Sequence, residues 1–187
     1  MQLQACVLIG LMMWMEDGMG AAEQGAGQMD GRWMVSARTL IFVRCGDRIL
    51  FMKRAPHKRI FPNRYNGLGG HLERDEDPHT SALREVREES GLEVENLKLC
   101  GIHHIDAGAD SGILLFVFTA DGDDQTPLAH SHEGALEWVP LDRVLGLDLV
   151  EDLPHALGRI LAMKPGDAPY FAHVSYDADD RIVIRYA

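Results

Sequence analysis

The chain has 187 residues, of which 46% are hydrophobic and 25% are charged, and its formal net charge is −11 at pH 7. This composition is typical of a globular protein and, without an apolar run of 18 residues, argues against a disordered chain or a membrane-spanning helix. The three cysteines form no C-x-x-C pair, which excludes a disulfide scaffold and a four-cysteine zinc site. We therefore expect reduced thiols in a cytoplasmic protein with no membrane partner.

The charge is distributed unevenly along the chain. Residues 34–70 carry a net charge of +7, whereas residues 71–187 carry −15. An acidic protein is a poor non-specific binder of nucleic acid polymers, because neutralising phosphates requires a basic face. A basic segment beside an acidic one instead fits a small anionic ligand bound with a divalent cation, although a solvated surface with uneven charge would give the same pattern.

Residues 1–33 differ from the rest of the chain. An apolar run, Ala5–Met15, is followed by a loose stretch rich in Gly, Ala and Gln. No Lys or Arg precedes Arg32, so the run lacks the basic start of a secretory signal, and it is too short to span a bilayer. We expect residues 1–33 to be a poorly ordered N-terminal extension and residues 34–187 to form the folded domain.

The first regular pattern is that of a β-hairpin. Ala37–Val43 and Ile49–Met52 are rich in strand-forming residues and are joined through a turn at residues 45–47. A basic loop follows over Arg54–Asn66, and then a glycine-rich stretch over Gly67–Leu72. These two segments lead into the first helix.

The first helix is predicted to end at Ser90. Asp77 is a favourable N-cap, Pro78 suits the first helical position, and Gly91 suits a left-handed C-terminal position. The strands and the second helix that follow predict a layered α/β domain. In chain order these are strands at Val94–Ile105 and Ile113–Thr119, a polar loop at Asp121–Glu133, a strand at Ala135–Val139, a helical turn at Leu141–Leu145, a helix at Val150–Met163, and a hairpin of Tyr170–Tyr176 and Arg181–Tyr186.

Three acidic residues share one face of the first helix. Glu85, Glu88 and Glu89 are spaced i, i+3 and i+4, and like charges at this spacing destabilise an isolated helix. A hard divalent cation would compensate, because clustered carboxylate oxygens are what Mg²⁺ binds. A solvated acidic helix face is the alternative that the glutamates alone leave open.

The spacing of residues around these glutamates is specific. It matches the complete Nudix box, G-x5-E-x7-R-E-U-x-E-E-x-G-U with U aliphatic, and the chain therefore resembles the Nudix hydrolases. The resemblance implies a Nudix-type α/β/α sandwich around a central mixed β-sheet, with the box forming a loop–helix–loop. It also implies Mg²⁺-dependent hydrolysis, with Mn²⁺ as an alternative, of a nucleoside diphosphate linked to another group. The matching positions are Gly70, Glu76, Arg84, Glu85, Val86, Glu88, Glu89, Gly91 and Leu92.

The resemblance also implies roles for individual residues. Glu88, Glu89 and the carbonyl of Gly69 would bind metal, and Glu85 would be a further ligand or the base that activates water. Arg84 would orient the glutamates by ion pairing. Independently, the basic loop could hold outer phosphates through Arg54, Arg59 and Arg64, although any one of these could equally be solvated.

The run Tyr65–Gly70 narrows the resemblance to MutT-like oxidised-purine nucleoside triphosphatases. By this resemblance, Asn66 would recognise the edge of the base. Glu133, five residues before Trp138, would help to bind the metal. Glu151 and Asp152 lie where these enzymes have a pair of acidic residues that recognise the base, although only one of the two is an Asp here. A turn residue at Asn66 and a surface acid at Glu133 are the alternatives.

The expected function is thus a Mg²⁺-dependent pyrophosphohydrolase that cleaves a nucleoside triphosphate, with oxidised dGTP as the candidate substrate, to a monophosphate and pyrophosphate. One alternative is a hydrolase of another conjugate, such as a nucleotide sugar or dinucleoside polyphosphate. A non-catalytic Nudix-fold binding module is another, which the intact glutamates disfavour. The sequence leaves open a monomer or a homodimer, and which glutamate is the base.

Overall fold

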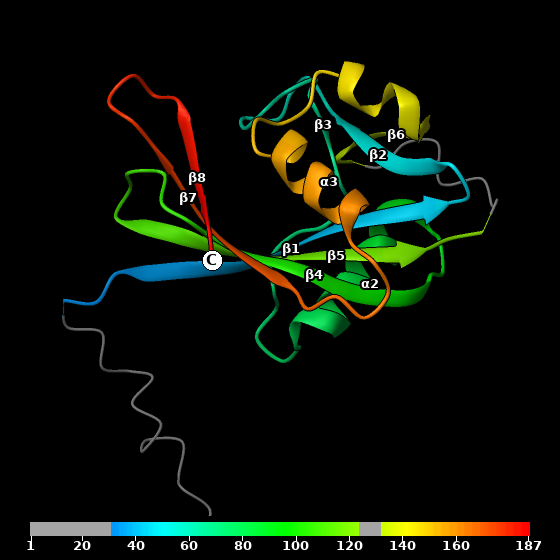
Figure 1. The fold of residues 1–187 in the computed structure, drawn as a ribbon, viewed down its shortest axis with the longest axis horizontal. Coiled ribbons are helices and arrows are strands. Elements are labelled where there is room, and N and C mark those ends of the chain that lie inside the picture. Colours follow the sequence, from blue (N-terminus) through cyan, green and yellow to red (C-terminus); the bar gives the residue numbers. More distant parts are fainter. Residues whose placement is uncertain (1–30, 124–131) are drawn as a thin grey trace, which may run out of the picture. The chain divides into compact units, whose positions relative to one another are not determined.

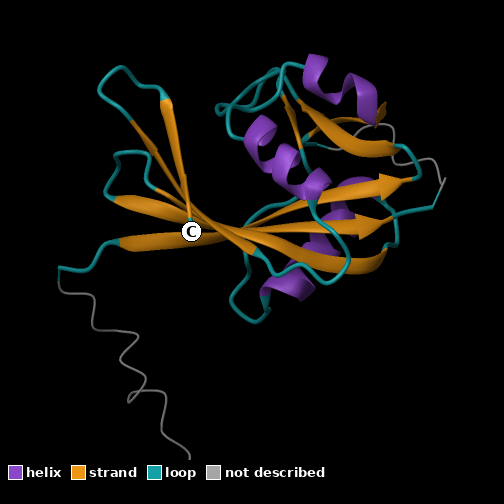
Figure 2. Ribbon diagram, viewed as in Figure 1, coloured by secondary structure: helices purple, strands orange, loops and turns teal. Residues whose placement is uncertain are grey.

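A mixed eight-stranded β-sheet organises residues Met34–Ala187 (Figures 1 and 2). The structure is a computed structural model that describes residues 31–123 and 132–187, so most of the predicted extension and of the polar loop lies outside the described residues. Within the described part, no helix has the length and apolarity needed to cross a membrane. The strands are β1 (Met34–Cys45), β2 (Arg48–Arg54), β3 (Tyr65–Asn66), β4 (Glu95–Ile105), β5 (Ser111–Asp121), β6 (Gly134–Pro140), β7 (Tyr170–Tyr176) and β8 (Ile182–Tyr186).

The strands follow the order β3-β2-β1-β5-β4-β7-β8, and β6 pairs with β2. The β1–β5 and β4–β7 pairs are parallel and the other pairs are antiparallel. The predicted hairpin of β1 and β2 is present only at its turn, where Arg44 lies opposite Ile49 and Cys45 opposite Arg48. Beyond that point Leu68 and His71 form bridges with β1, so β2 pairs instead with β3 and β6.

Helices cover both faces of the sheet, which confirms the predicted α/β/α sandwich. Alternate residues of β1 point to opposite faces, so Ile41 packs in the cluster with α2 (Pro78–Ser90). Leu40 and Phe42 pack in the cluster with α3 (Leu153–Ala162). A short 3₁₀ helix, η2 (Leu141–Gly146), lies at the predicted helical turn.

The ends of α2 agree with the prediction. The Asp77 carboxylate accepts hydrogen bonds from the backbone N–H groups of His79 and Thr80, at 2.8 and 3.0 Å. Gly91 has φ +71°, and its N–H donates to the carbonyl of Arg87. These contacts fix where the glutamate-bearing helix starts and stops.

The start of α3 differs from the prediction by three residues. Leu149 forms a bridge with Tyr65, and the N–H of Val150 donates to the carbonyl of Tyr65 at 3.0 Å. Residues 149–150 therefore extend alongside β3, and the helix begins only at Leu153. This arrangement places Asp152 at the N-terminus of α3.

His103 on β4 is a buried neutral histidine, with 2% of its surface exposed. Its Nε2 lies 2.9 Å from the hydroxyl of Tyr170, and burial lowers the pKa of the ring to about 4. The unfolded chain, with an ordinary histidine pKa, therefore binds more protons between about pH 6.5 and 4. The contribution of neutral His103 to the free energy of unfolding is therefore fully present above about pH 6.5, and it is lost as the pH falls from there towards 4.

We predict that His103→Phe flattens the pH dependence of stability in that window. The wild type should lose about 3 kcal/mol at most through His103 between pH 7 and 4, and the variant should not. The measurement is the unfolding free energy of both proteins across this range. Glu89, whose pKa is also shifted, titrates in both proteins, so their difference isolates His103. Identical pH profiles would contradict the prediction.

Candidate active site

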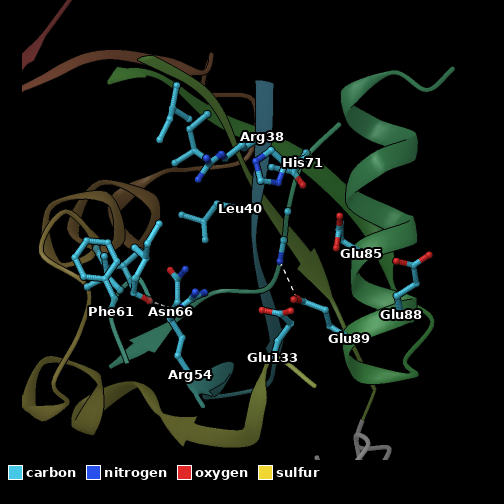
Figure 3. Close-up of a pocket in the computed structure, with 18 of the residues that line it drawn as sticks. Arg38, Leu40, Arg54, Phe61, Asn66, His71, Glu85, Glu88, Glu89 and Glu133 are labelled. Atoms are coloured by element: carbon cyan, nitrogen blue, oxygen red, sulfur yellow. Dashed lines mark hydrogen bonds between the residues drawn. The ribbon is translucent and has the colours of Figure 1, made fainter. Parts of the chain in front are cut away.

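A pocket of about 730 Å³ is lined by α2, the start of α3 and the middle of β1 (Figure 3). Four of the carboxylates in its lining are Glu85, Glu88 and Glu89 of α2 and Glu133 before β6. Asn66 and Asp152 line it from β3 and the start of α3. The fold thus brings together residues separated by more than 80 positions in the sequence.

Two glycines bring the loop before α2 close to its neighbours. Gly69 has φ +135°, and a Cβ there would lie 2.2 Å from the carbonyl oxygen of Thr39. A Cβ at Gly70 would lie 2.5 Å from Oε1 of Glu85. The N–H of Gly69 donates to Oε2 of Glu89 at 2.9 Å, so the glycine loop, which precedes the glutamates in the sequence, also helps to position them.

Arg84 is the centre of an ion-pair network on α2. Its guanidinium donates to Glu76 at 2.7 and 3.0 Å, and to Glu85 and Glu88 at 3.0 Å each. It also donates to the carbonyl oxygen of His71 at 3.2 Å. The hydrogen bonds from Arg84 lower the pKa of Glu76 to about 2, and the carboxylates raise the pKa of Arg84. The predicted orienting contacts of Arg84 are present.

The carboxylates of the pocket repel one another. Burial raises the pKa of Glu85. For Glu89, burial, with added repulsion from Glu85 and Glu133, raises the pKa to about 8, while the N–H of Gly69 and Arg54 oppose the shift. Opposite charge is needed to keep such a cluster ionised. The positive groups nearby are Arg84, which pairs with Glu85 and Glu88, Arg54, and Lys58, which pairs with Glu133 at 2.5 Å.

The donor set of this cluster fits a hard divalent cation. Carboxylate oxygens and a backbone carbonyl are the ligands that Mg²⁺ and Mn²⁺ prefer, and a bound cation reverses the pKa shift that burial causes. Within residues 31–123 and 132–187, no three His, Cys, Asp or Glu side chains are already gathered around one point. Glu88, with 60% of its side chain exposed, is held by Arg84 instead. The chemistry of the donors fits, and their final convergence requires side-chain movement.

Asn66 and Asp152 supply polar groups at a second part of the pocket. Oδ1 of Asn66 accepts from the N–H of Gly67 at 3.0 Å, which leaves its amide NH₂ as the available donor. Asp152 is half-buried, and the desolvation of its carboxyl group raises its pKa. Phe61 lines the same part, beside Asn66 in Figure 3.

Three predicted substrate-binding residues do not line the pocket. Arg59 is exposed, and Arg64 pairs with Glu151 at 3.3 Å and with Asp148 at 3.8 Å. Of the predicted basic group, the structure brings only Arg54 to the lining, and of the predicted acidic pair only Asp152. The reason is local, because the Arg64–Glu151 pair joins the basic loop to the turn before α3 outside the cavity.

The pocket also contains residues that the sequence reasoning missed. Arg38 of β1 and His71 line it, together with an apolar wall from β4 and β5. A signal for Arg38 was available, because it alternates with the buried residues Leu40 and Phe42 on one face of a strand. The wall consists of Ile105, Ile113 and Leu115.

A layered α/β domain that carries a glutamate-bearing loop–helix beside a ligand-sized pocket defines the class of Nudix-fold proteins. The family model described as the NUDIX domain matches residues 34–162. The chain therefore belongs to the Nudix hydrolases, enzymes that act on pyrophosphate bonds of nucleotide substrates.

Individual relatives agree with this placement. The chain is 31% identical over 149 residues to a mouse protein named oxidized purine nucleoside triphosphate hydrolase, covering 78% of this chain and 89% of the relative. It is 31% identical over 128 residues to the NAD-capped RNA hydrolase NudC of Chromobacterium violaceum, covering 67% of this chain and 45% of that protein. The crystal structure of the mutator MutT protein from Bacillus halodurans superposes with a TM-score of 0.70 at 25% identity, covering 81% of this chain and 97% of that one.

Proposed function

We propose that this protein is a Mg²⁺-dependent pyrophosphohydrolase that cleaves a purine nucleoside triphosphate, preferring oxidised dGTP, to the nucleoside monophosphate and pyrophosphate. One observation carries the proposal. A single pocket joins a cluster of four carboxylates to a part lined by Asn66, Asp152 and apolar side chains. The first part suits metal-bound phosphates and the second a heterocyclic base. The mouse relative's name supports this substrate class.

The residues that would hold the metal are Glu85, Glu88, Glu89, Glu133 and the carbonyl of Gly69. When bound, the cation would polarise a phosphoryl oxygen and lower the pKa of a coordinated water. Arg84 acts through the glutamates, as a positioning residue whose hydrogen bonds hold Glu85 and Glu88. Arg54 lines the pocket close enough to Glu89 to affect its charge, so it can also balance phosphate charge.

The chemical step is the displacement of one phosphate by water. A bond forms between the water oxygen and phosphorus, and the anhydride P–O bond breaks with its electron pair leaving on pyrophosphate. The proton of the water passes to a glutamate carboxylate of the pocket. Fixed charges aimed at the phosphoryl oxygens stabilise this transition state more than the ground state.

The proposal is tested with a panel of substrates in Mg²⁺ and in Mn²⁺, with pyrophosphate and phosphate detection. The panel holds oxidised dGTP, dGTP, a nucleotide sugar, a dinucleoside polyphosphate and NAD⁺. We expect the highest kcat/KM for oxidised dGTP, with pyrophosphate released. A higher kcat/KM for one of the last three compounds would overturn the triphosphate assignment. Binding without turnover of any compound would favour the non-catalytic module.

We predict that Asn66→Ala reduces the preference for oxidised dGTP over dGTP. The loss should be about 1–3 kcal/mol, the cost of one buried hydrogen bond, because the amide NH₂ of Asn66 faces the pocket without being used by Gly67. The measurement is kcat/KM for both nucleotides. Asn96→Ala, at an exposed asparagine on β4, is the control. An equal decrease for every substrate would mean that Asn66 serves only the turn.

A further inference from the structure

Arg38 is a half-buried cation in the lining of the pocket. It lies on the face of β1 that also carries Leu40, and its Nε is shielded from solvent. Among the residues that the structure describes, no acceptor bonds to this Nε and no carboxylate pairs with the guanidinium. Shielding this N–H from water without a partner costs free energy, which a ligand with an acceptor atom would recover.

The surroundings of Arg38 favour a ring over a phosphate. Leu115 lies opposite Arg38 in the β1–β5 register, and Ile113 is two residues away on the same strand. Both line the pocket, as does Leu40. Apolar side chains of this kind pack against a flat heterocycle, whereas a phosphate would keep its water.

Two other arginines line the pocket. Arg84 is bonded to Glu85 and Glu88, and Arg54 lies at the opposite end of the view in Figure 3 from Arg38, beside Glu133. Leu40 and Asn66 are drawn between Arg38 and Arg54. The backbone of His71 forms an antiparallel β-bridge with that of Arg38. Burial and the charge of Arg38 both lower the pKa of the His71 ring. Thus the phosphate-binding charges gather near the glutamates, and Arg38 belongs to the other part of the pocket.

The polar groups of that part complement one kind of base. Arg38 and the amide NH₂ of Asn66 are donors, and the Asp152 carboxylate is an acceptor with no hydrogen-bond partner from another described residue. A guanine-type ring presents carbonyl oxygens and N–H groups on its edges, whereas unmodified adenine has no carbonyl.

We propose that Arg38 is a specificity-determining residue that donates to a carbonyl oxygen of the substrate's purine ring. The inference rests on the proposed function and adds to it a preference for carbonyl-bearing bases. Asp152 takes the N–H edge of the same ring. The two side chains form no ion pair with each other, so both remain available to the ligand.

The test uses Arg38→Met, which keeps an unbranched apolar stem and removes the charge and the hydrogen-bond donors. Four nucleotides are compared: dGTP, oxidised dGTP, dATP, and dATP oxidised at C8, which gains a carbonyl. We expect kcat/KM to fall roughly 10- to 100-fold for one or more of the carbonyl-bearing nucleotides, the cost of a hydrogen bond from a charged donor. For dATP it should stay within about twofold.

Arg44→Met is the matched control, since Arg44 lies on the same strand but outside the pocket lining. It should leave all four values unchanged. The melting temperature of Arg38→Met should stay the same or rise, because a shielded N–H without an acceptor among the described residues is removed. A large fall in melting temperature would instead assign Arg38 a structural role.

Two results overturn the inference. An equal loss for all four nucleotides would place Arg38 on the phosphates, and no change for any of them would leave it without a part in recognition. Failure of the proposed function looks different, because the wild type itself would then hydrolyse none of the four. In that case the Kd values of the four corresponding nucleoside monophosphates are measured. The inference stands only if Arg38→Met selectively weakens binding of the monophosphates whose bases carry a carbonyl.

Discussion

Glu89→Gln should lower turnover by at least about a hundredfold while leaving the fold intact. Glu89 is the most buried of the α2 carboxylates in the pocket, and its environment opposes its charge unless a cation is bound. Glutamine keeps an oxygen that can still accept from the N–H of Gly69, so the glycine loop retains its anchor. What is lost is the negative charge that would hold the metal against the phosphates.

The measurement is the initial rate on oxidised dGTP over a range of Mg²⁺ concentrations, with the melting temperature in the absence of metal. The melting temperature should not fall, because the metal-free pocket disfavours the charged form of Glu89 and glutamine is neutral. Glu93→Gln is the control, since Glu93 is exposed, pairs with Arg87 and lies outside the pocket. Wild-type activity in excess chelator, or a fully active Glu89→Gln protein, would disprove the metal role.

The part of the site that could be predicted is the part encoded locally. The caps at Asp77 and Gly91 and the spacing of the glutamates fix α2 within one stretch of chain, and the structure agrees in detail. The contacts of Arg84 follow from the same stretch, since Glu76, Glu85 and Glu88 lie within eight positions of it.

The opposite wall of the pocket could not be predicted in this way. It depends on the parallel pairing of β1 with β5, which places Leu115 beside Arg38 although they are far apart in the sequence. A hairpin pattern gives the neighbour of a strand on one side only, and here the pairing on that side ends after two residues. The role expected of Glu151 was likewise based on spacing, which does not show that Arg64 pairs with it.

Gly70→Ala should lower kcat by about a hundredfold without removing any charged group. A Cβ at Gly70 would lie 2.5 Å from Oε1 of Glu85, closer than such atoms approach, and the flexible carboxylate is the group that can move. The backbone of Gly70 does not require a glycine conformation, so folding should be preserved. The expected result is a protein with a nearly normal melting temperature whose Glu85 is displaced.

Two other glycines make this prediction specific. Gly158→Ala, on α3 with no atom near the added Cβ, should retain activity and gain up to about 1 kcal/mol of stability. Gly69→Ala should instead destabilise the fold, since its φ is +135° and the new atom would meet the backbone of Thr39. The measurements are kcat and melting temperature for all three variants. If Gly70→Ala keeps wild-type kcat, the position of Glu85 is not required for turnover. If Gly70→Ala is destabilised as Gly69→Ala should be, the added Cβ at Gly70 disturbs the backbone instead of the Glu85 carboxylate. Comparing the two variants therefore distinguishes a displaced carboxylate from a loss of folded structure.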